Sequence, residues 1–108
     1  MATTYKVLGQ SNPSATTETT LYTAGAAAVV STLVICNQAS TAATYRIAVR
    51  PAADGSTAAK HWIVYGATVG ASDSTALTLG ITLAEGDLIR VYASTATLSF
   101  SAFGSEIA

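Results

Sequence analysis

Few residues of this chain have side chains that could take part in chemistry, and they form no recognisable motif. His61 is the only histidine and Cys36 is the only cysteine. A metal site needs several converging His, Cys or carboxylate ligands, and a nucleophilic Cys–His pair needs proximity and an orienting group. We expect His61 to lie on a sheet face or at an interface, and Cys36 to be a small buried hydrophobic residue. A single cysteine also excludes an intrachain disulfide.

The six acidic residues lie in or beside expected turns, where carboxylates commonly cap the backbone. They are Glu18, Asp54, Asp73, Glu85, Asp87 and Glu106. Paired carboxylates could hydrolyse a glycosidic bond. Glu85 with Asp87 could bind Ca²⁺ weakly, although one pair supplies too few ligands. Because the sequence also lacks a phosphate loop, a Ser–His–Asp signature and a cysteine cluster, we expect no enzyme, no metal and no cofactor.

Three aromatic residues provide the other candidate site. Trp62, together with Tyr65 or Tyr92, could form a platform for a sugar ring. The alternative is that these rings pack in the core or at a contact between subunits. The first alternative predicts a receptor-binding or carbohydrate-binding module, and the second predicts a structural protein.

Length and charge limit the classes of function. The chain has 108 residues, the size of one domain, and a net charge of −1. Its five basic residues are scattered: Lys6, Arg46, Arg50, Lys60 and Arg90. Nucleic-acid binding requires clustered basic residues, so we expect no nucleic-acid partner. We also expect no membrane partner, because the N-terminus lacks the pattern of a signal peptide and no apolar run approaches the ~18 residues of a membrane helix.

The elements that must position these residues are β-strands. Residues alternate between apolar and polar in 43–50 and in 77–83, where Leu77, Leu79, Ile81 and Leu83 should share a buried face. The expected strands are about 4–9, 17–23, 28–37, 43–50, 60–66, 75–83, 87–93 and 96–103. Strands at this spacing without helices predict an all-β fold, a single antiparallel β-sandwich of jelly-roll or immunoglobulin-like type. We expect residues 1–108 to form one domain, with 1–20 as a candidate extended N-terminal arm.

Two of the expected strands are apolar on both faces, which predicts self-association. In 28–37, Val29, Leu33 and Ile35 should face one way, and Val30, Val34 and Cys36 the other. In 60–66, Trp62 and Val64 should lie opposite Ile63 and Tyr65. One thin sandwich core cannot cover so much apolar surface. We therefore expect a homo-oligomer, in particular a trimer, with candidate interface residues Val30, Val34, Trp62 and Val64.

Several stretches together resemble a group of small structural proteins in the virions of tailed bacteriophages. They include "VVSTLVICNQAS", "YRIAVRP", "KHWIVYG", "LTLGITLAEGDLIRVYAS" and "SFSAFGSEI", and the resemblance runs from Tyr5 to Ile107. The chain departs from the group's pattern at Ala24-Gly25-Ala26, where the group has a turn containing proline. The resemblance implies an all-β module located on the virion, and it assigns no catalytic or ligand-binding residues.

Within that group, the short chain without an attachment domain or coiled coil favours one role. This role is a capsid decoration (cement) protein on the capsid exterior, which would bind the major capsid protein. The alternatives are a component of the tail, baseplate or fibre, or the receptor-binding or carbohydrate-binding module that the aromatic residues suggest.

Overall fold

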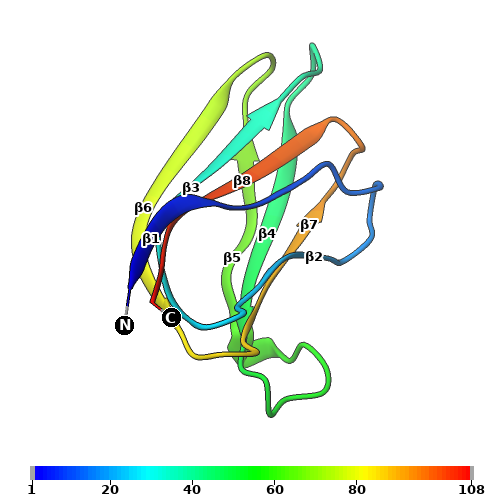
Figure 1. The fold of residues 1–108 in the computed structure, drawn as a ribbon. Helices are drawn as coiled ribbons and strands as arrows, with labels where there is room; N and C mark the ends of the chain where they lie inside the picture. Colours follow the sequence, from blue (N-terminus) through cyan, green and yellow to red (C-terminus); the bar gives the residue numbers. More distant parts are fainter. Residues whose placement is uncertain (1, 108) are drawn as a thin grey trace.

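A computed structural model describes residues 2–107, which form two four-stranded antiparallel sheets packed face to face (Figure 1). Sheet A has the order β1-β8-β3-β6 and sheet B has the order β2-β7-β4-β5. The strands are β1 (Thr3–Ser11), β2 (Thr19–Thr23), β3 (Ala27–Asn37), β4 (Ala43–Arg50), β5 (Trp62–Val69), β6 (Ser74–Leu83), β7 (Leu88–Ala93) and β8 (Leu98–Ile107), with a short 3₁₀ helix η1 (Ala59–His61) before β5. The prediction of an all-β antiparallel sandwich with about eight strands is confirmed.

The strand pairing identifies the topology as a jelly roll. The first strand pairs with the last, the second with the seventh, the third with the sixth, and the fourth with the fifth. The chain therefore resembles one long antiparallel hairpin, with its tip between β4 and β5, wrapped into two layers. Immunoglobulin-like sandwiches have a different strand order, so the structure decides between the two alternatives that the sequence left open.

The core lies between the two sheets and follows the alternation of the strands. In β7 and at the start of β8, every second side chain is buried. The largest fully buried apolar side chains come from both sheets: Val30, Leu33, Ile35, Ile47, Val69, Ile89, Val91, Leu98 and Phe100. Tyr45 of sheet B meets Phe100 of sheet A edge to face, with ring centroids 6.2 Å apart. Each such buried side chain stabilises the fold by about 1.5–3 kcal/mol.

Irregularities in three strands line up across sheet A. In β1, Leu8 is an extra residue opposite β8, and in β3, Ser31 is an extra residue opposite the same part of β8. In β6, Leu79 and Gly80 together face the single residue Ser31, and Gly80 has a φ of +64°. Bulges bend a strand and change which side chains point inward. Because the irregularities in β1, β3 and β6 lie side by side, side chains beyond them point to the opposite face from the one that simple alternation predicts.

These bulges overturn part of the expected side-chain facing. Val30 and Leu33 were expected on opposite faces of β3, but both are buried in the core. Leu79 was expected on the buried face, but it is 47% exposed. The strand expected at 60–66 continues through Gly66 to Val69 as β5, with a φ of +87° at the glycine.

Two glycines allow backbones to approach closely. A Cβ atom at Gly9 would lie 2.2 Å from the carbonyl oxygen of Leu21, where edge strand β1 meets edge strand β2. A Cβ atom at Gly104 would lie 2.0 Å from the carbonyl oxygen of Val29, next to the bulge of β3. Only glycine fits at either position without a shift of the backbone.

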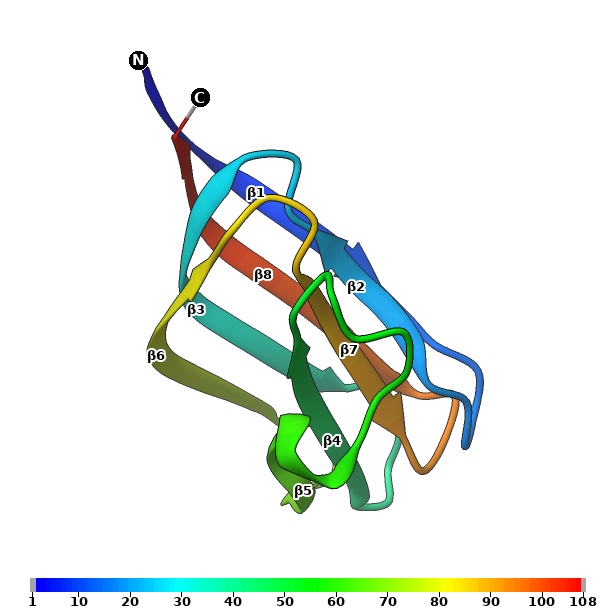
Figure 2. The ribbon, with the colours of Figure 1, turned by 90° about the horizontal axis from the view of Figure 1, so that it is seen from below.

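The expected N-terminal arm is mostly a strand of the sandwich. Residues 3–11 pair with β8 along their whole length as β1, beside the C-terminal end of the chain (Figure 2). The Asn12 side chain donates hydrogen bonds to the carbonyl oxygens of Ala96 and Leu98, and Pro13 is buried. The arm hypothesis is therefore wrong for residues 3–13, and Met1 lies outside the described residues.

Candidate interaction surfaces

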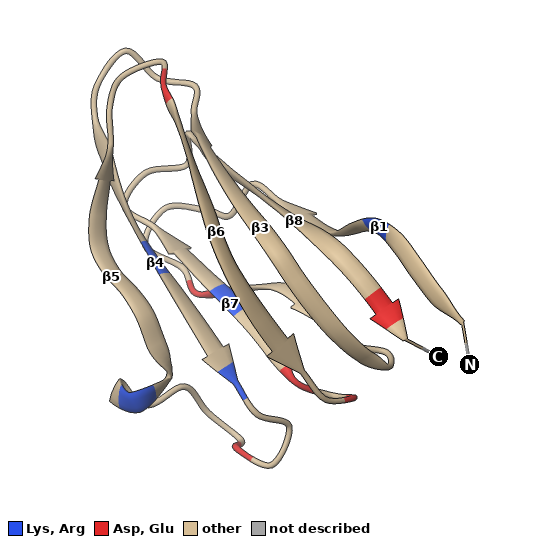
Figure 3. Ribbon diagram, turned by 90° about the vertical axis from the view of Figure 1, so that its left-hand side faces the viewer, with Lys and Arg blue, Asp and Glu red and all other residues tan. Residues whose placement is uncertain are grey.

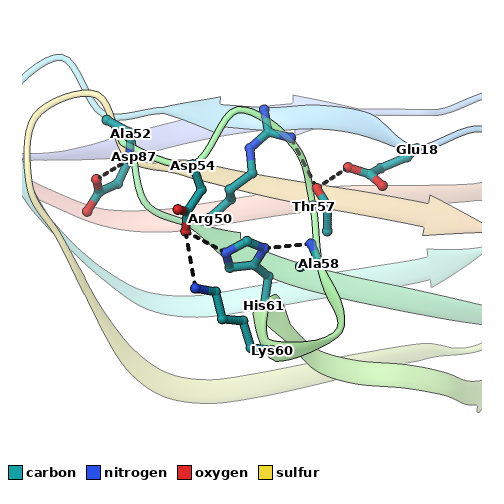
Figure 4. Close-up of polar contacts among 9 residues, drawn as sticks. All are labelled: Glu18, Arg50, Ala52, Asp54, Thr57, Ala58, Lys60, His61 and Asp87. Atoms are coloured by element: carbon teal, nitrogen blue, oxygen red, sulfur yellow. Dashed lines mark hydrogen bonds and ion pairs between the residues drawn. The ribbon is translucent and has the colours of Figure 1, made fainter.

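His61 anchors the loop of residues 51–61, which joins β4 to β5. Its imidazole is buried, accepts the Ala58 N–H at Nδ1 over 2.8 Å, and contacts Asp54 Oδ2 from Nε2 over 2.8 Å (Figure 4). Because Nδ1 accepts a hydrogen bond, the ring proton lies on Nε2, which donates to the carboxylate. Both ring nitrogens are thus engaged within the loop. His61 was expected on a sheet face or at an interface, and it lies instead at the end of η1.

The hydrogen bond from His61 lowers the pKa of Asp54 below its ordinary value of 3.8. Lys60, with Nζ 3.9 Å from Asp54 Oδ2, contributes to the same effect. The Asp54 carboxylate therefore stays ionised at neutral pH. Its contact with His61 joins the first half of the loop to the last residue of the loop.

A second set of hydrogen bonds ties this loop to the segment before β2. The Thr57 hydroxyl donates to Glu18 Oε2 over 2.5 Å and accepts from Arg50 Nη1 over 3.1 Å (Figure 4). Arg90 Nε donates to the same Glu18 oxygen over 2.7 Å. Burial raises the pKa of Glu18, but the bonds from Thr57 and Arg90 outweigh it, so the net pKa lies below 4.5. Glu18 is therefore held as a carboxylate between sheet B and the loop.

Asp87 fixes the loop at a third point. Its Oδ1 accepts the Ala52 N–H and its Oδ2 accepts the Ala84 N–H, each over 2.9 Å. The pair of Glu85 and Asp87 was considered as a weak Ca²⁺ site. In the structure, both carboxylate oxygens of Asp87 are used to join the turn between β6 and β7 to the start of loop 51–61.

The outer side of sheet B carries a row of aromatic and arginine side chains. Arg46 on β4 is the register partner of Tyr65 on β5 and of Tyr92 on β7. Its Cζ atom lies 4.1 Å from the centroid of Tyr65 and 4.4 Å from that of Tyr92, which is cation–π distance. Trp62 meets Tyr65 edge to face, with centroids 5.6 Å apart. The sequence indicated these rings but gave no sign that Arg46 joins them.

A shallow pocket of about 540 Å³ lies beside this row of rings. Its walls are the two rings of Trp62 and Tyr65 and the loop residues Thr57, Ala58 and Ala59. We call it the aromatic pocket.

The outer face of sheet A differs, because β3 and β6 contain no charged residue (Figure 3). In the described parts of β1 and β8, the charged residues are Lys6 and Glu106. They pair over 2.7 Å, and the Tyr22 hydroxyl of sheet B donates to Glu106. The bonds from Lys6 and Tyr22 lower the pKa of Glu106 below 4.5. Because Tyr22 belongs to the opposite sheet, its hydrogen bond to Glu106 connects sheet B to sheet A.

Exposed apolar side chains gather on strand β1 of sheet A. Tyr5 is 83% exposed and Val7 is 50% exposed, both on β1. Together with Val29, Phe103 and the ion-paired Lys6, they line a shallow depression of about 510 Å³. We call the surface formed by Tyr5, Val7, Val29 and Phe103 the apolar face. The sequence did not indicate it, because only the pairing of β1 with β8 and of β8 with β3 brings these residues together.

The four predicted interface residues do not share a surface. Val30 is fully buried, so the prediction is wrong for this residue, and Val64 is partly buried against the core. Val34 is partly exposed on the outer side of sheet A, and Trp62 is partly exposed on the outer side of sheet B. Cys36 was expected to be buried, and it is partly exposed beside Val34. The extra residue Ser31 in β3 turns Val30 toward the core, and an extra residue in β5, Ile63, does the same for Val64.

The chain matches no protein-family model and has no significant match among curated proteins. Within residues 2–107, no three His, Cys, Asp or Glu side chains form a group that could hold a metal ion. The same part of the chain contains no helix that is long and apolar enough to cross a membrane. The geometry itself defines a jelly-roll protein with two outer surfaces of different chemistry, the apolar face and the aromatic pocket.

Proposed function

We propose that the protein is a structural protein of a tailed-bacteriophage virion, namely a capsid decoration protein on the capsid exterior. The resemblance from Tyr5 to Ile107 supports the class. The jelly roll agrees with it, since viral capsid proteins commonly use this fold, although a fold alone does not determine a function.

The observation that carries the proposal is the apolar face of sheet A. Small proteins seldom leave contiguous apolar surface exposed unless another molecule covers it. Its exposed Tyr5 and Val7 contribute binding free energy of about 25 cal/mol per Å² of buried apolar area, less the costs of association. We propose that this face packs against other copies in a homotrimer, because closed symmetry lets each copy cover the apolar face of its neighbours.

The proposed mechanism is mechanical. A trimer that binds the major capsid protein in the assembled shell, but not its free subunits, stabilises the shell by mass action. Three linked copies also bind a repeating lattice more tightly than one copy does. Particles that lack the protein should assemble but break at a lower temperature or under a lower osmotic stress.

The test is a low-resolution map of the particle into which this chain is placed, together with co-sedimentation of the protein with empty shells. Density on the capsid exterior and binding to the shells are the expected results. If the protein occurs only on the tail, baseplate or fibre, the capsid assignment is wrong and the tail alternative replaces it. Absence from the particle would contradict the whole proposal.

A further inference from the structure

The aromatic pocket lies apart from the apolar face, because its rings stand on the outer side of sheet B. Tyr65 is 65% exposed although it contacts both Arg46 and Trp62. We propose that the aromatic pocket binds a neutral sugar ring of a glycan, stacked on Tyr65 and bounded by Trp62. This site goes beyond the structural role proposed above and does not depend on it.

The arrangement of the two rings suits a pyranose. Their planes are inclined by 71°, so they form two walls of a corner. One face of a pyranose presents C–H groups with partial positive charge, which are attracted to the negative face of an aromatic ring. Arg46 lies over one face of the Tyr65 ring, which nevertheless remains 65% exposed, and the exposed part of the ring is the surface that we assign to the sugar. The small side chains of Ala58 and Ala59 leave room for its hydroxyl groups at the third wall.

The pocket is already formed in the free protein. Loop 51–61 supplies three of its residues and is fixed by the His61–Asp54 contact, by the Thr57–Glu18 hydrogen bond and by the bond from Ala52 to Asp87. A ligand therefore does not have to order the loop, and this ordering cost is absent from the binding free energy.

The size and charge of the pocket select the kind of ligand. Its volume of about 540 Å³ falls in the range of small-molecule sites, about 300–1,000 Å³. A protein partner would need about 800 Å² of surface on each side, far more than five lining residues provide. Among the described residues, none that lines the pocket is charged, so the lining suits a neutral ligand better than an anionic one. A small neutral sugar satisfies both conditions.

Trp62 is the only tryptophan of the chain, so its fluorescence reports directly on the pocket. The experiment titrates the protein with cellohexaose, maltohexaose and N-acetylchitohexaose while recording this emission. At least one of the three should give a saturable change with a Kd near or below about 1 mM. The Kd should stay the same in about 0.5 M NaCl, because no ion pair is involved. Tyr65→Ala should weaken binding at least tenfold.

Two further variants complete the test. Tyr5→Ala removes another exposed tyrosine, on the opposite sheet, and should leave the Kd unchanged. Ala59→Glu places a larger charged side chain in the pocket and should abolish binding while both rings remain. The proposal is overturned if no oligosaccharide changes the emission at about 10 mM, or if Tyr65→Ala and Ala59→Glu bind as well as the original protein. It is also overturned if Tyr65→Ala dissociates an oligomer in sedimentation, since the rings would then be a contact between copies.

Discussion

The guanidinium of Arg46 lies over the ring of Tyr65, with Cζ 4.1 Å from the ring centroid, and the ring of Tyr92 lies within 4.4 Å on the other neighbouring strand. Arg46 on β4 is the register partner of Tyr65 on β5 and of Tyr92 on β7. They therefore connect three strands of sheet B through contacts outside the core.

Arg46→Ala should lower the free energy of unfolding by about 1–2 kcal/mol, because it removes two cation–π contacts. Arg46→Lys keeps the charge but loses the planar stacking, so its free energy of unfolding should lie between those of the original protein and Arg46→Ala. Urea unfolding followed by Trp62 fluorescence measures both values. A loss below about 0.5 kcal/mol for Arg46→Ala would show that the contacts add no stability.

His61→Ala should lower the free energy of unfolding by about 2–3 kcal/mol. The change removes a buried ring and leaves the Ala58 N–H and the Asp54 carboxylate without their partner. The matched control is Lys60→Ala, the preceding residue, whose side chain is largely exposed and should contribute under about 0.5 kcal/mol. Equal effects of the two variants would contradict the anchoring role of His61.

The sequence predicted the strands well, because alternation and turn residues are local signals. Residues 43–50 were predicted with the bounds that the structure shows, and most other strands differ by a few residues. The predicted facing of the Val30 and Leu79 side chains was wrong. A bulge depends on the register with a partner strand and leaves no periodic signal in the sequence. Gly80 and Gly104 were the available hints, since a glycine inside a strand often marks a bulge or a close backbone approach.

The candidate surfaces were harder to predict for the same reason. Trp62 and Tyr65 were recognised as a possible platform from residue type, but the pocket also needs Thr57, which loop 51–61 brings to the rings. The apolar face joins Tyr5 on β1 to Phe103 on β8, which are far apart in sequence. Only the pairing of the first strand with the last places them together.

Gly104→Ala should lower the free energy of unfolding by more than about 3 kcal/mol, because the new Cβ would lie 2.0 Å from the Val29 carbonyl oxygen. Gly55→Ala is the control. No atom lies within 4 Å of a Cβ at Gly55, so its effect should stay within about 1 kcal/mol. Thermal and urea unfolding measure both. A stable Gly104→Ala variant would show that β3 and β8 can separate at the bulge without cost.

Acid should destabilise the protein through Glu18, Asp54 and Glu106, whose pKa values are all lowered in the folded state. At acidic pH the unfolded chain therefore binds protons more readily than the folded protein does, so the free energy of unfolding rises with pH. The stabilisation that the two glutamates provide is complete above the ordinary glutamate pKa of 4.5. It is lost as the pH falls through their lowered pKa values in the folded state. Melting temperatures between about pH 3 and pH 7 should show this decline, and Glu106→Gln should make it shallower. A flat profile would contradict the lowered pKa values.

A point substitution is needed to test the apolar face, because truncation is not selective. Removal of residues 1–10 would delete Tyr5 and Val7 of the apolar face. These residues include most of β1, which pairs with β8 along its length. The truncation should therefore unfold the protein, and a thermal melt of the truncated chain checks this expectation.

Val7→Asp should separate assembly from folding. Val7 is 50% exposed on edge strand β1, so the free subunit should lose under about 1 kcal/mol of stability. In a packed interface the new carboxylate would be buried without a partner, which costs several kcal/mol and should weaken self-association at least about 100-fold. The control is Ile63→Asp, since Ile63 is 48% exposed on edge strand β5 of the other sheet. Sedimentation velocity and co-sedimentation with empty shells should show dissociation and loss of attachment for Val7→Asp only. If Val7→Asp remains oligomeric, or if both variants dissociate alike, sheet A does not provide the contact between copies.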